Sequence, residues 1–175
     1  MRRFLASTAL MAVLVTGMVA AAPSAQASSS DEAGFVARIN SLRQSKGLAP
    51  LSVDGNLTSI GRNWSQKMLN AGSISHNPSF PSQVTSNWSK LGENVGHGGS
   101  VDSLFKAFVN SPAHYRNLVD PAFTHIGVGV VTGPDGSLWT SHQFMTLAGS
   151  SAPKAAAPAA APRAPRRAAV AAPVR

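Results

Sequence analysis

Apolar side chains recur at the spacing of an amphipathic helix in the first part of the chain. Residues 29–46 carry three of them on one face, at Phe35, Ile39 and Leu42. Ser29 and Glu32 have the spacing of a capping box, and Gly47 follows as a stop signal. The pattern predicts a first helix over residues 29–46.

The same periodicity predicts three further helices. Residues 55–70 carry an apolar stripe, which we interpret as packing residues and not as a cofactor site. Residues 101–109 follow Ser100, a favourable N-cap, and have their apolar positions on one face. Residues 112–119 follow Ser111 and begin with proline, which is the usual start of a short helix.

Between the second and third helices the pattern loses its period. Residues 73–100 are rich in Ser, Asn, Pro and Gly, and a short helix over residues 81–88 is the only regular element expected there. Irregular stretches of this length in a compact domain are usually functional or disordered. Several large apolar side chains can attach this segment to a core, so we expect a functional loop.

The last folded stretch reads as a β-hairpin. Residues 126–132 and 138–147 are the strands, and Gly133-Pro-Asp-Gly136 is the turn. Both strands are apolar on both faces at several positions, which is typical of a sheet covered on each side. The expected fold is α+β, a three-layer α/β/α sandwich with a small antiparallel sheet between helices.

The two ends of the chain differ from the middle. Residues 1–27 combine two arginines, an apolar run and the small-residue site Ala25-Gln-Ala27, which predicts a signal peptide cleaved after Ala27 and a secreted protein. Residues 28–149 are long enough for one domain. Residues 150–175 consist mostly of Ala, Pro and basic residues, so we expect a disordered tail of polyproline II character.

The positive charge is concentrated in that tail. The formal net charge is +8, yet residues 28–149 hold eight Lys and Arg against seven Asp and Glu, whereas residues 150–175 hold five basic residues and no acid. Such a tail is expected to bind anionic cell-envelope polymers or lipid head groups, or else to be a soluble spacer. A specific nucleic-acid partner is not expected for an exported protein.

Composition and motifs exclude several chemistries. The chain has no cysteine, so thiol nucleophiles, thiolate metal sites and disulfides are excluded. It also lacks the G-x-S-x-G elbow, the H-E-x-x-H helix and the nucleotide-binding glycine motifs. No serine is placed by the sequence as a nucleophile.

A carboxylate between two histidines is the strongest candidate site. Glu93 lies between Gly92 and Asn94, where small neighbours let the carboxylate enter a cleft. His76 precedes it, and His114 follows it in the first turn of the predicted helix 112–119. The positive end of a helix dipole disfavours a protonated imidazole, so His114 is expected to be neutral.

Four segments together carry a family resemblance. His76-Asn-Pro78, Gly92-Glu-Asn-Val95, Ser111-Pro-Ala-His-Tyr-Arg-Asn117 and Phe123-Thr-His-Ile-Gly-Val-Gly-Val130 follow one another in an order and at a spacing that resemble the bacterial branch of the CAP superfamily. That superfamily comprises the cysteine-rich secretory, antigen and pathogenesis-related proteins. The resemblance covers residues 31–147 and implies the same three-layer sandwich.

The resemblance also implies a cleft lined by two histidines and two acids, which holds a divalent metal in some members. His76, Glu93 and His114 match three of these positions. The fourth falls on Ser111, with Phe108 in place of a tryptophan, so the second carboxylate is absent. The expected cleft residues are therefore His76, Glu93, His114, Ser111 and Asn94.

A divalent metal such as zinc is an open expectation. His76 and His114 would be the ligands, although stable catalytic zinc usually has three protein ligands. Glu93 could be a third ligand or could orient one imidazole, and a single carboxylate favours the orienting role. His97 is interpreted as a solvated loop residue, and His125 and His142 as structural residues.

Three function classes remain open. The first is a secreted module that binds a lipid, another small molecule or a peptide in the cleft. The second is a metal-assisted hydrolase with Glu93 as general base. The third is an envelope or host-surface interaction protein. The missing fourth residue weakens catalysis more than binding, so binding is preferred.

Overall fold

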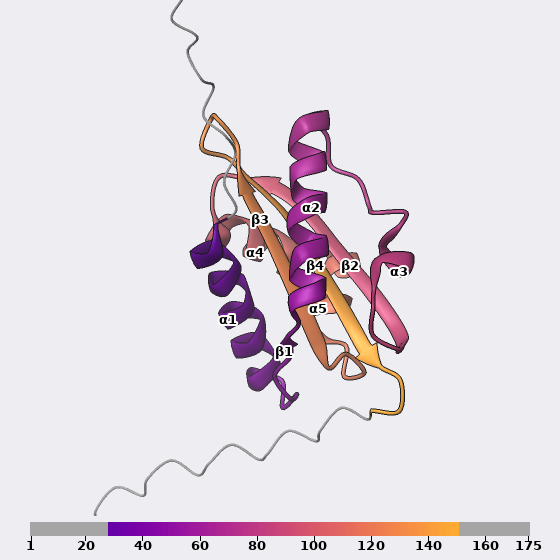
Figure 1. The fold of residues 1–175 in the computed structure, drawn as a ribbon. Coiled ribbons are helices and arrows are strands. Elements are labelled where there is room, and N and C mark those ends of the chain that lie inside the picture. Colours follow the sequence, from indigo (N-terminus) through magenta and orange to yellow (C-terminus); the bar gives the residue numbers. More distant parts are fainter. Residues whose placement is uncertain (1–27, 151–175) are drawn as a thin grey trace, which may run out of the picture.

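The computed structural model describes residues 28–150, which fold as helices around one sheet (Figure 1). The helices are α1 (Ser29–Ser45), α2 (Gly55–Ala71), α3 (Phe80–Gln83), α4 (Val101–Asn110) and α5 (Pro112–Val119). The strands are β1 (Ser52–Val53), β2 (Trp88–Gly98), β3 (His125–Thr132) and β4 (Leu138–Leu147). The expected signal peptide and almost all of the expected basic tail lie outside the described residues.

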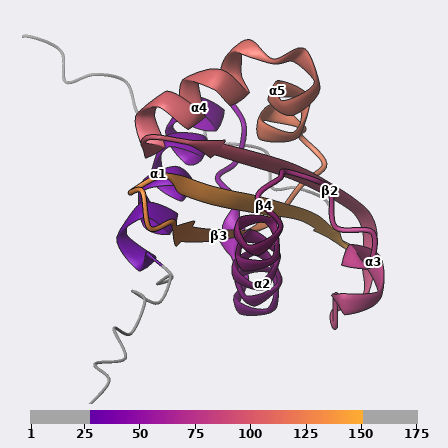
Figure 2. The same ribbon diagram turned by 90° about the horizontal axis from the view of Figure 1, so that it is seen from above.

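The sheet has the strand order β1-β3-β4-β2 and is covered on both faces. Helix α2 packs on one face, and α1, α4 and α5 pack on the other (Figure 2). The three-layer α+β sandwich is therefore confirmed. The sheet is mixed rather than purely antiparallel, because β1 pairs with β3 in parallel. This strand has only two residues, too few for an alternating pattern to be recognised in the sequence.

The prediction of an irregular segment over residues 73–100 is wrong for its second half. Residues Trp88–Gly98 form β2, which pairs with β4 along its length. Its glycines are not turn residues. A Cβ on Gly92 would lie 2.7 Å from the Phe123 ring, and one on Gly96 would lie 2.8 Å from the Phe108 ring. The Phe123 and Phe108 rings fill the space where side chains of β2 would lie, so glycine stands at these positions. The sequence of β2 therefore lacks the alternation of apolar and polar residues by which a strand is recognised.

Two local predictions fail at the ends of elements. The N-cap of α1 is Ser28 and makes no side-chain capping bond, so the proposed box of Ser29 and Glu32 does not form. The Glu32 carboxylate instead accepts two bonds from Arg62, at 2.7 and 2.6 Å. The short helix expected over residues 81–88 is shorter and earlier, at Phe80–Gln83. The N-cap at Ser100 is confirmed.

Helix α2 lies directly on the backbone of β3. A Cβ on Gly61 would be 2.7 Å from the Gly129 nitrogen, and a Cβ on Gly127 or Gly129 would overlap the α2 backbone. The Ser65 hydroxyl also donates to the Gly129 carbonyl at 3.0 Å. Three glycines thus bring helix and strand closer than side chains would allow, and this sets the position of α2 and of the segment that follows it.

A buried arginine joins α1 to the connections at one end of the sheet. Arg43 is fully buried and donates four hydrogen bonds to backbone carbonyls, those of Ala49, Leu118, Asp120 and Phe123. Burial lowers the pKa of the Arg43 guanidinium, and the nearby charge of Asp120 opposes this shift. Because backbone carbonyls, and not an adjacent carboxylate, accept the hydrogen bonds of Arg43, this residue is a structural cross-link.

His142 lies in the core between α1 and α4. Its ring packs edge-on against Phe35 and Phe108, with ring centroids 4.6 and 5.1 Å away. The Thr140 hydroxyl donates its single hydrogen bond to the Gly129 carbonyl. Its oxygen can then only accept from His142, so Nε2 of His142 carries a hydrogen and donates it to Thr140. Within the described chain, His142 Nδ1 is buried and has no hydrogen-bond partner. The interpretation of His142 as structural agrees with this placement.

Within residues 28–150, no helix combines the length and apolar character that crossing a bilayer requires.

The close contact of α2 with β3 predicts a severe effect of Gly129→Ala. The added methyl group overlaps the backbone at Gly61 and Arg62, so we expect the free energy of unfolding to fall by about 3 kcal/mol or more. Gly99→Ala is the matched control, because a Cβ there meets no atom within 4 Å. Urea denaturation of both variants measures the difference. Equal stability of the two would contradict the packing described above.

The buried His142 predicts a loss of stability in acid. Burial, and secondarily the charge of His114, lowers the His142 pKa from 6.5 to about 3. Between pH 6.5 and about 3, His142 is therefore protonated in the unfolded chain but neutral in the folded chain. The folded state loses stability as the pH falls through this range. The full effect is on the order of 5 kcal/mol. Urea midpoints at several pH values should fall less steeply for His142→Leu than for the wild type.

Candidate functional site

Glu93 is the centre of a hydrogen-bond network on β2. Its side chain is only 7% exposed, and its two oxygens accept four hydrogen bonds. The Ser141 hydroxyl and the Gln143 amide donate to Oε1, at 3.2 and 2.9 Å. The His76 ring and the Asn77 backbone N–H donate to Oε2, at 2.7 and 3.0 Å. A carboxylate bonded in this way is a fixed acceptor and not a free surface acid.

His76 is held by this carboxylate at the surface. The bond runs from Nδ1, and the side chain is 67% exposed. The segment that carries it is attached at two further points, since Asn77 N–H bonds to Glu93 and the Trp64 indole donates to the Ser75 carbonyl at 2.7 Å. A carboxylate only accepts, so Nδ1 carries the proton and Nε2 faces away from Glu93.

His114 comes from α5 on the opposite side of β2. Its ring packs edge-on against Phe108, with centroids 5.1 Å apart. Partial burial is the main cause that lowers the His114 pKa, and the charge of His76 lowers it further. The lowered pKa favours the neutral state that the sequence analysis expects for His114.

Two asparagines join β2 to α5. Asn94 donates to the His114 carbonyl at 3.1 Å, and Asn117 donates to the Glu93 carbonyl at 3.1 Å and to the Asn94 side chain at 2.8 Å. Asn94 is fully buried, so the expectation that it lines the cleft is wrong. It positions His114 instead. Ser111 lies at the N-cap of α5, but its side chain makes no capping bond.

The sequence reasoning missed Ser141 and Gln143. Both lie on β4, and Gln143 is the partner of Glu93 in the strand register. The signal was a continuous polar run in the middle of the strand, Thr140-Ser-His-Gln143, in which Ser141 and Gln143 share one face. It could be interpreted only after Glu93 had been placed on the neighbouring strand.

The remaining histidines lie outside this network. His97 is exposed on β2 and stacks on Trp139, with ring centroids 4.1 Å apart, so the loop assignment made for it is wrong. His125 begins β3 and bonds to the Thr124 hydroxyl at 2.8 Å. His142 is in the core.

The donor set does not fit a resident catalytic metal. Within the described chain, no group of three or more His, Cys, Asp or Glu side chains is arranged to hold an ion. Both oxygens of Glu93 are occupied by protein donors, which leaves His76 and His114 as an imidazole pair without a third protein ligand. Catalytic zinc sites usually have three.

Comparison with known sequences supports the motif-based resemblance. The sequence model of the cysteine-rich secretory protein family, abbreviated CAP, matches residues 36–144. The uncharacterized protein YkwD of Bacillus subtilis is 35% identical over 133 residues, which are 71% of this chain and 50% of YkwD. The chain thus spans half the length of this relative.

Solved structures share the fold. An outer surface protein of Borrelia burgdorferi has a TM-score of 0.63 at 19% identity, and the match covers 68% of this chain and 94% of that protein. An extracellular protein of Bacillus anthracis that contains an SCP domain has a TM-score of 0.59 at 20% identity, with 67% and 40% covered. At these identities the likeness shows the fold alone.

The bonds of Glu93 predict that this residue stabilises the domain. Glu93→Ala leaves its donors without an acceptor, so we expect the free energy of unfolding to fall by about 1 to 3 kcal/mol. The control is Asp102→Ala, which removes an exposed acid in a surface ion pair with Arg38 and should change it by less than about 1 kcal/mol. Chemical denaturation measures both. Wild-type stability of Glu93→Ala would mean that the network does not form in solution.

Proposed function

Because the chain belongs to the cysteine-rich secretory protein (CAP) family, we propose that it is an exported binding module that recognises its ligand through His76 and His114 beside β2. The observation that carries this proposal is the state of Glu93. Its two oxygens hold four protein donors, one of which is the His76 ring. Glu93 therefore acts as a positioning residue for His76.

The chemistry of the two imidazoles favours a neutral polar ligand. In the neutral form His76 offers the Nε2 lone pair as an acceptor, because Nδ1 donates to Glu93. Partial burial lowers the pKa of His114, which therefore keeps one donor and one acceptor near neutral pH. Hydroxyl and amide groups complement such a pair. A sugar polymer presents hydroxyl groups and a peptide backbone presents amide groups, and each kind of group can donate and accept.

A metal-assisted hydrolase is less well supported. In that mechanism Glu93 would have to release its protein donors to act as a base, and the metal would need a third ligand. Ser111 stands where the family resemblance leads one to expect a second acid, and serine supplies no carboxylate. We therefore derive no reaction step from a metal.

An extracellular location is part of the proposal. It is supported by the signal-like residues 1–27 and by the descriptions of similar folds as an outer surface protein and an extracellular protein. N-terminal sequencing of the protein recovered from the culture medium tests it, and Ser28 is the expected first residue.

The binding proposal predicts shifts at the two ring systems. On titration with a short N-acetylglucosamine oligomer or an alanine oligopeptide, the imidazole ¹⁵N signals of His76 and His114 should move and saturate. His76→Ala should abolish the shifts at His114, whereas the control His97→Ala should retain them, because His97 stacks on Trp139 away from the network. Shifts at His114 that persist in His76→Ala would overturn the proposed ligand contact.

Metal analysis tests the alternative. Protein purified without a histidine tag should contain no stoichiometric zinc, and calorimetric titration with Zn²⁺ should give only weak binding, since two imidazoles are fewer than the usual three ligands. One equivalent of tightly bound metal that is lost in both His76→Ala and His114→Ala would restore the hydrolase hypothesis.

A further inference from the structure

A groove separate from the histidine site lies between α1 and α2. Its volume is about 420 Å³, which is within the range of small-molecule pockets. Residues of α1, α2, β1 and β3 line it, so it lies beside the edge of the sheet that is opposite to β2. The residues that bind Glu93 do not line this groove.

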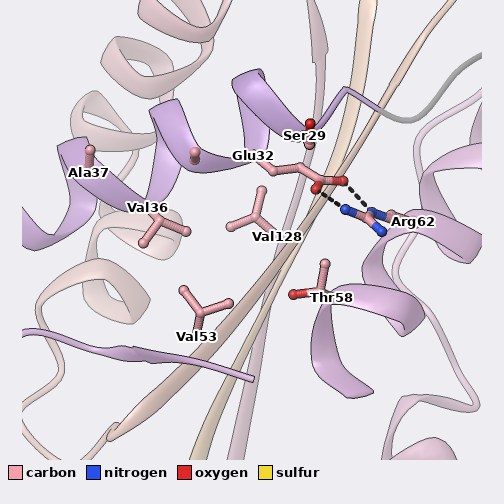
Figure 3. A pocket seen from close by; sticks show the side chains of 9 residues that line it. Ser29, Glu32, Val36, Ala37, Val53, Thr58, Arg62 and Val128 are labelled. Carbon is pink, nitrogen blue, oxygen red and sulfur yellow. Dashed lines mark hydrogen bonds and ion pairs between the residues drawn. The ribbon is translucent and has the colours of Figure 1, made fainter. Parts of the chain in front are cut away.

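One side of the groove is apolar. Val36, Ala37, Val53 and Val128 form it (Figure 3). Ala33 and Ala37 are one helical turn apart on α1, and their short side chains leave space that larger residues would fill. Val53 is 62% exposed, although it is a large apolar side chain. An apolar ligand that covers Val53 would remove this surface from water, which is favourable.

The other side of the groove is polar, but its charges are balanced. Figure 3 shows Glu32 and Arg62 there, joined as an ion pair, with Thr58 nearby. Arg62 donates Nε to Oε1 and Nη2 to Oε2 of Glu32, and Oε1 also accepts the Val130 N–H at 3.3 Å. Each charge of the pair already has its partner. A charged ligand would therefore meet no unpaired opposite charge on this side.

Two groups on α2 remain available to a ligand. Thr58 and Arg62 are four residues apart and so lie on one face of the helix. Arg62 is 42% exposed, and within residues 28–150 no hydrogen bond involves its Nη1, which can only donate. The Thr58 hydroxyl donates its hydrogen to the Asp54 carbonyl at 2.9 Å, so its oxygen can only accept. A hydroxyl group complements this pair, because it accepts one hydrogen bond and donates another.

We propose that the groove binds a neutral small molecule with an apolar body and one hydroxyl group. The apolar body lies against Val36, Ala37 and Val53, and the hydroxyl accepts from Arg62 and donates to Thr58. A carboxylate or an ammonium in place of the hydroxyl would lose its hydration without gaining an opposite charge. The groove shares no residue with the histidine site, so this inference goes beyond the function proposed above and does not depend on it.

Three probes with the same apolar body test the hydroxyl assignment. They are cyclohexylmethanol, cyclohexanecarboxylate and cyclohexylmethylamine. In the exported chain with ¹³C-methyl valine and isoleucine, the alcohol should shift the signals of Val36, Val53 and Val128 and saturate. Both charged probes should bind about tenfold more weakly or worse. No saturable shift with the alcohol, or equal affinity for a charged probe, would overturn the proposal.

The methyl ether of the same alcohol tests the contact with Thr58, because it accepts a hydrogen bond but cannot donate one. The wild type should bind the alcohol about fivefold more tightly than the ether. Thr58→Val keeps the shape of the side chain and removes the acceptor, so this variant should lose the preference. A preference for the alcohol that persists in Thr58→Val contradicts the assignment.

Matched alanine variants separate the groove from general apolar adsorption. Ala37→Phe fills the groove and should abolish the valine shifts, whereas Ala107→Phe on α4 should keep them. Both alanines are exposed, so both variants are expected to fold. Shifts that survive Ala37→Phe, or that appear equally at the exposed Ile74, would show non-specific adsorption and overturn the proposal.

Two further readouts exclude other occupants and the other site. The valine signals of the protein without probe should not depend on its concentration, since a dependence would assign the groove to a second copy of the chain. The ring signals of His76 and His114 should stay in place when cyclohexylmethanol is added. Shifts at these rings without shifts at the groove valines would place the probe in the histidine site, and the groove proposal would fail.

Discussion

The contact between α2 and β3 is the constraint on which the rest of the structure depends. Gly61, Gly127 and Gly129 let the helix backbone rest on the strand backbone, so the position of α2 tolerates no added methyl group there. The segment after α2 carries His76, and the start of α2 takes the carbonyl that would otherwise extend β1 along β3. The position of the segment that carries His76 therefore follows from this close contact.

Polar groups in this domain are used mainly as fixed connections. Glu93 joins β2, β4 and the His76 segment, Arg43 joins α1 to the connections at one end of the sheet, and Glu32 joins α1, α2 and β3. Such connections stand in for the disulfides that a chain without cysteine cannot form. A carboxylate bound on both oxygens is a poor base, and this is the physical reason for proposing binding and not catalysis.

The two candidate surfaces differ in chemistry and in the elements that build them. The histidine site lies beside β2, at one edge of the sheet, and offers imidazole nitrogens to polar groups. The groove between α1 and α2 lies beside β1 and β3, at the other edge, and has mostly apolar walls. The two surfaces share no residue.

The sequence by itself determined the elements whose signals are local. The helices at Val101–Asn110 and Pro112–Val119, the cap at Ser100 and the β3–β4 hairpin were predictable, because periodicity, caps and turn residues act within a few positions. His76, Glu93 and His114 could be named from their motifs. Only the tertiary structure decided that Glu93 lies on a strand, that Ser141 and Gln143 bind it, and that Asn94 is buried behind it. Those facts depend on which residues meet across the sheet. Glycines face the rings of Phe108 and Phe123, so the sequence of β2 lacks the apolar alternation by which a strand can be predicted.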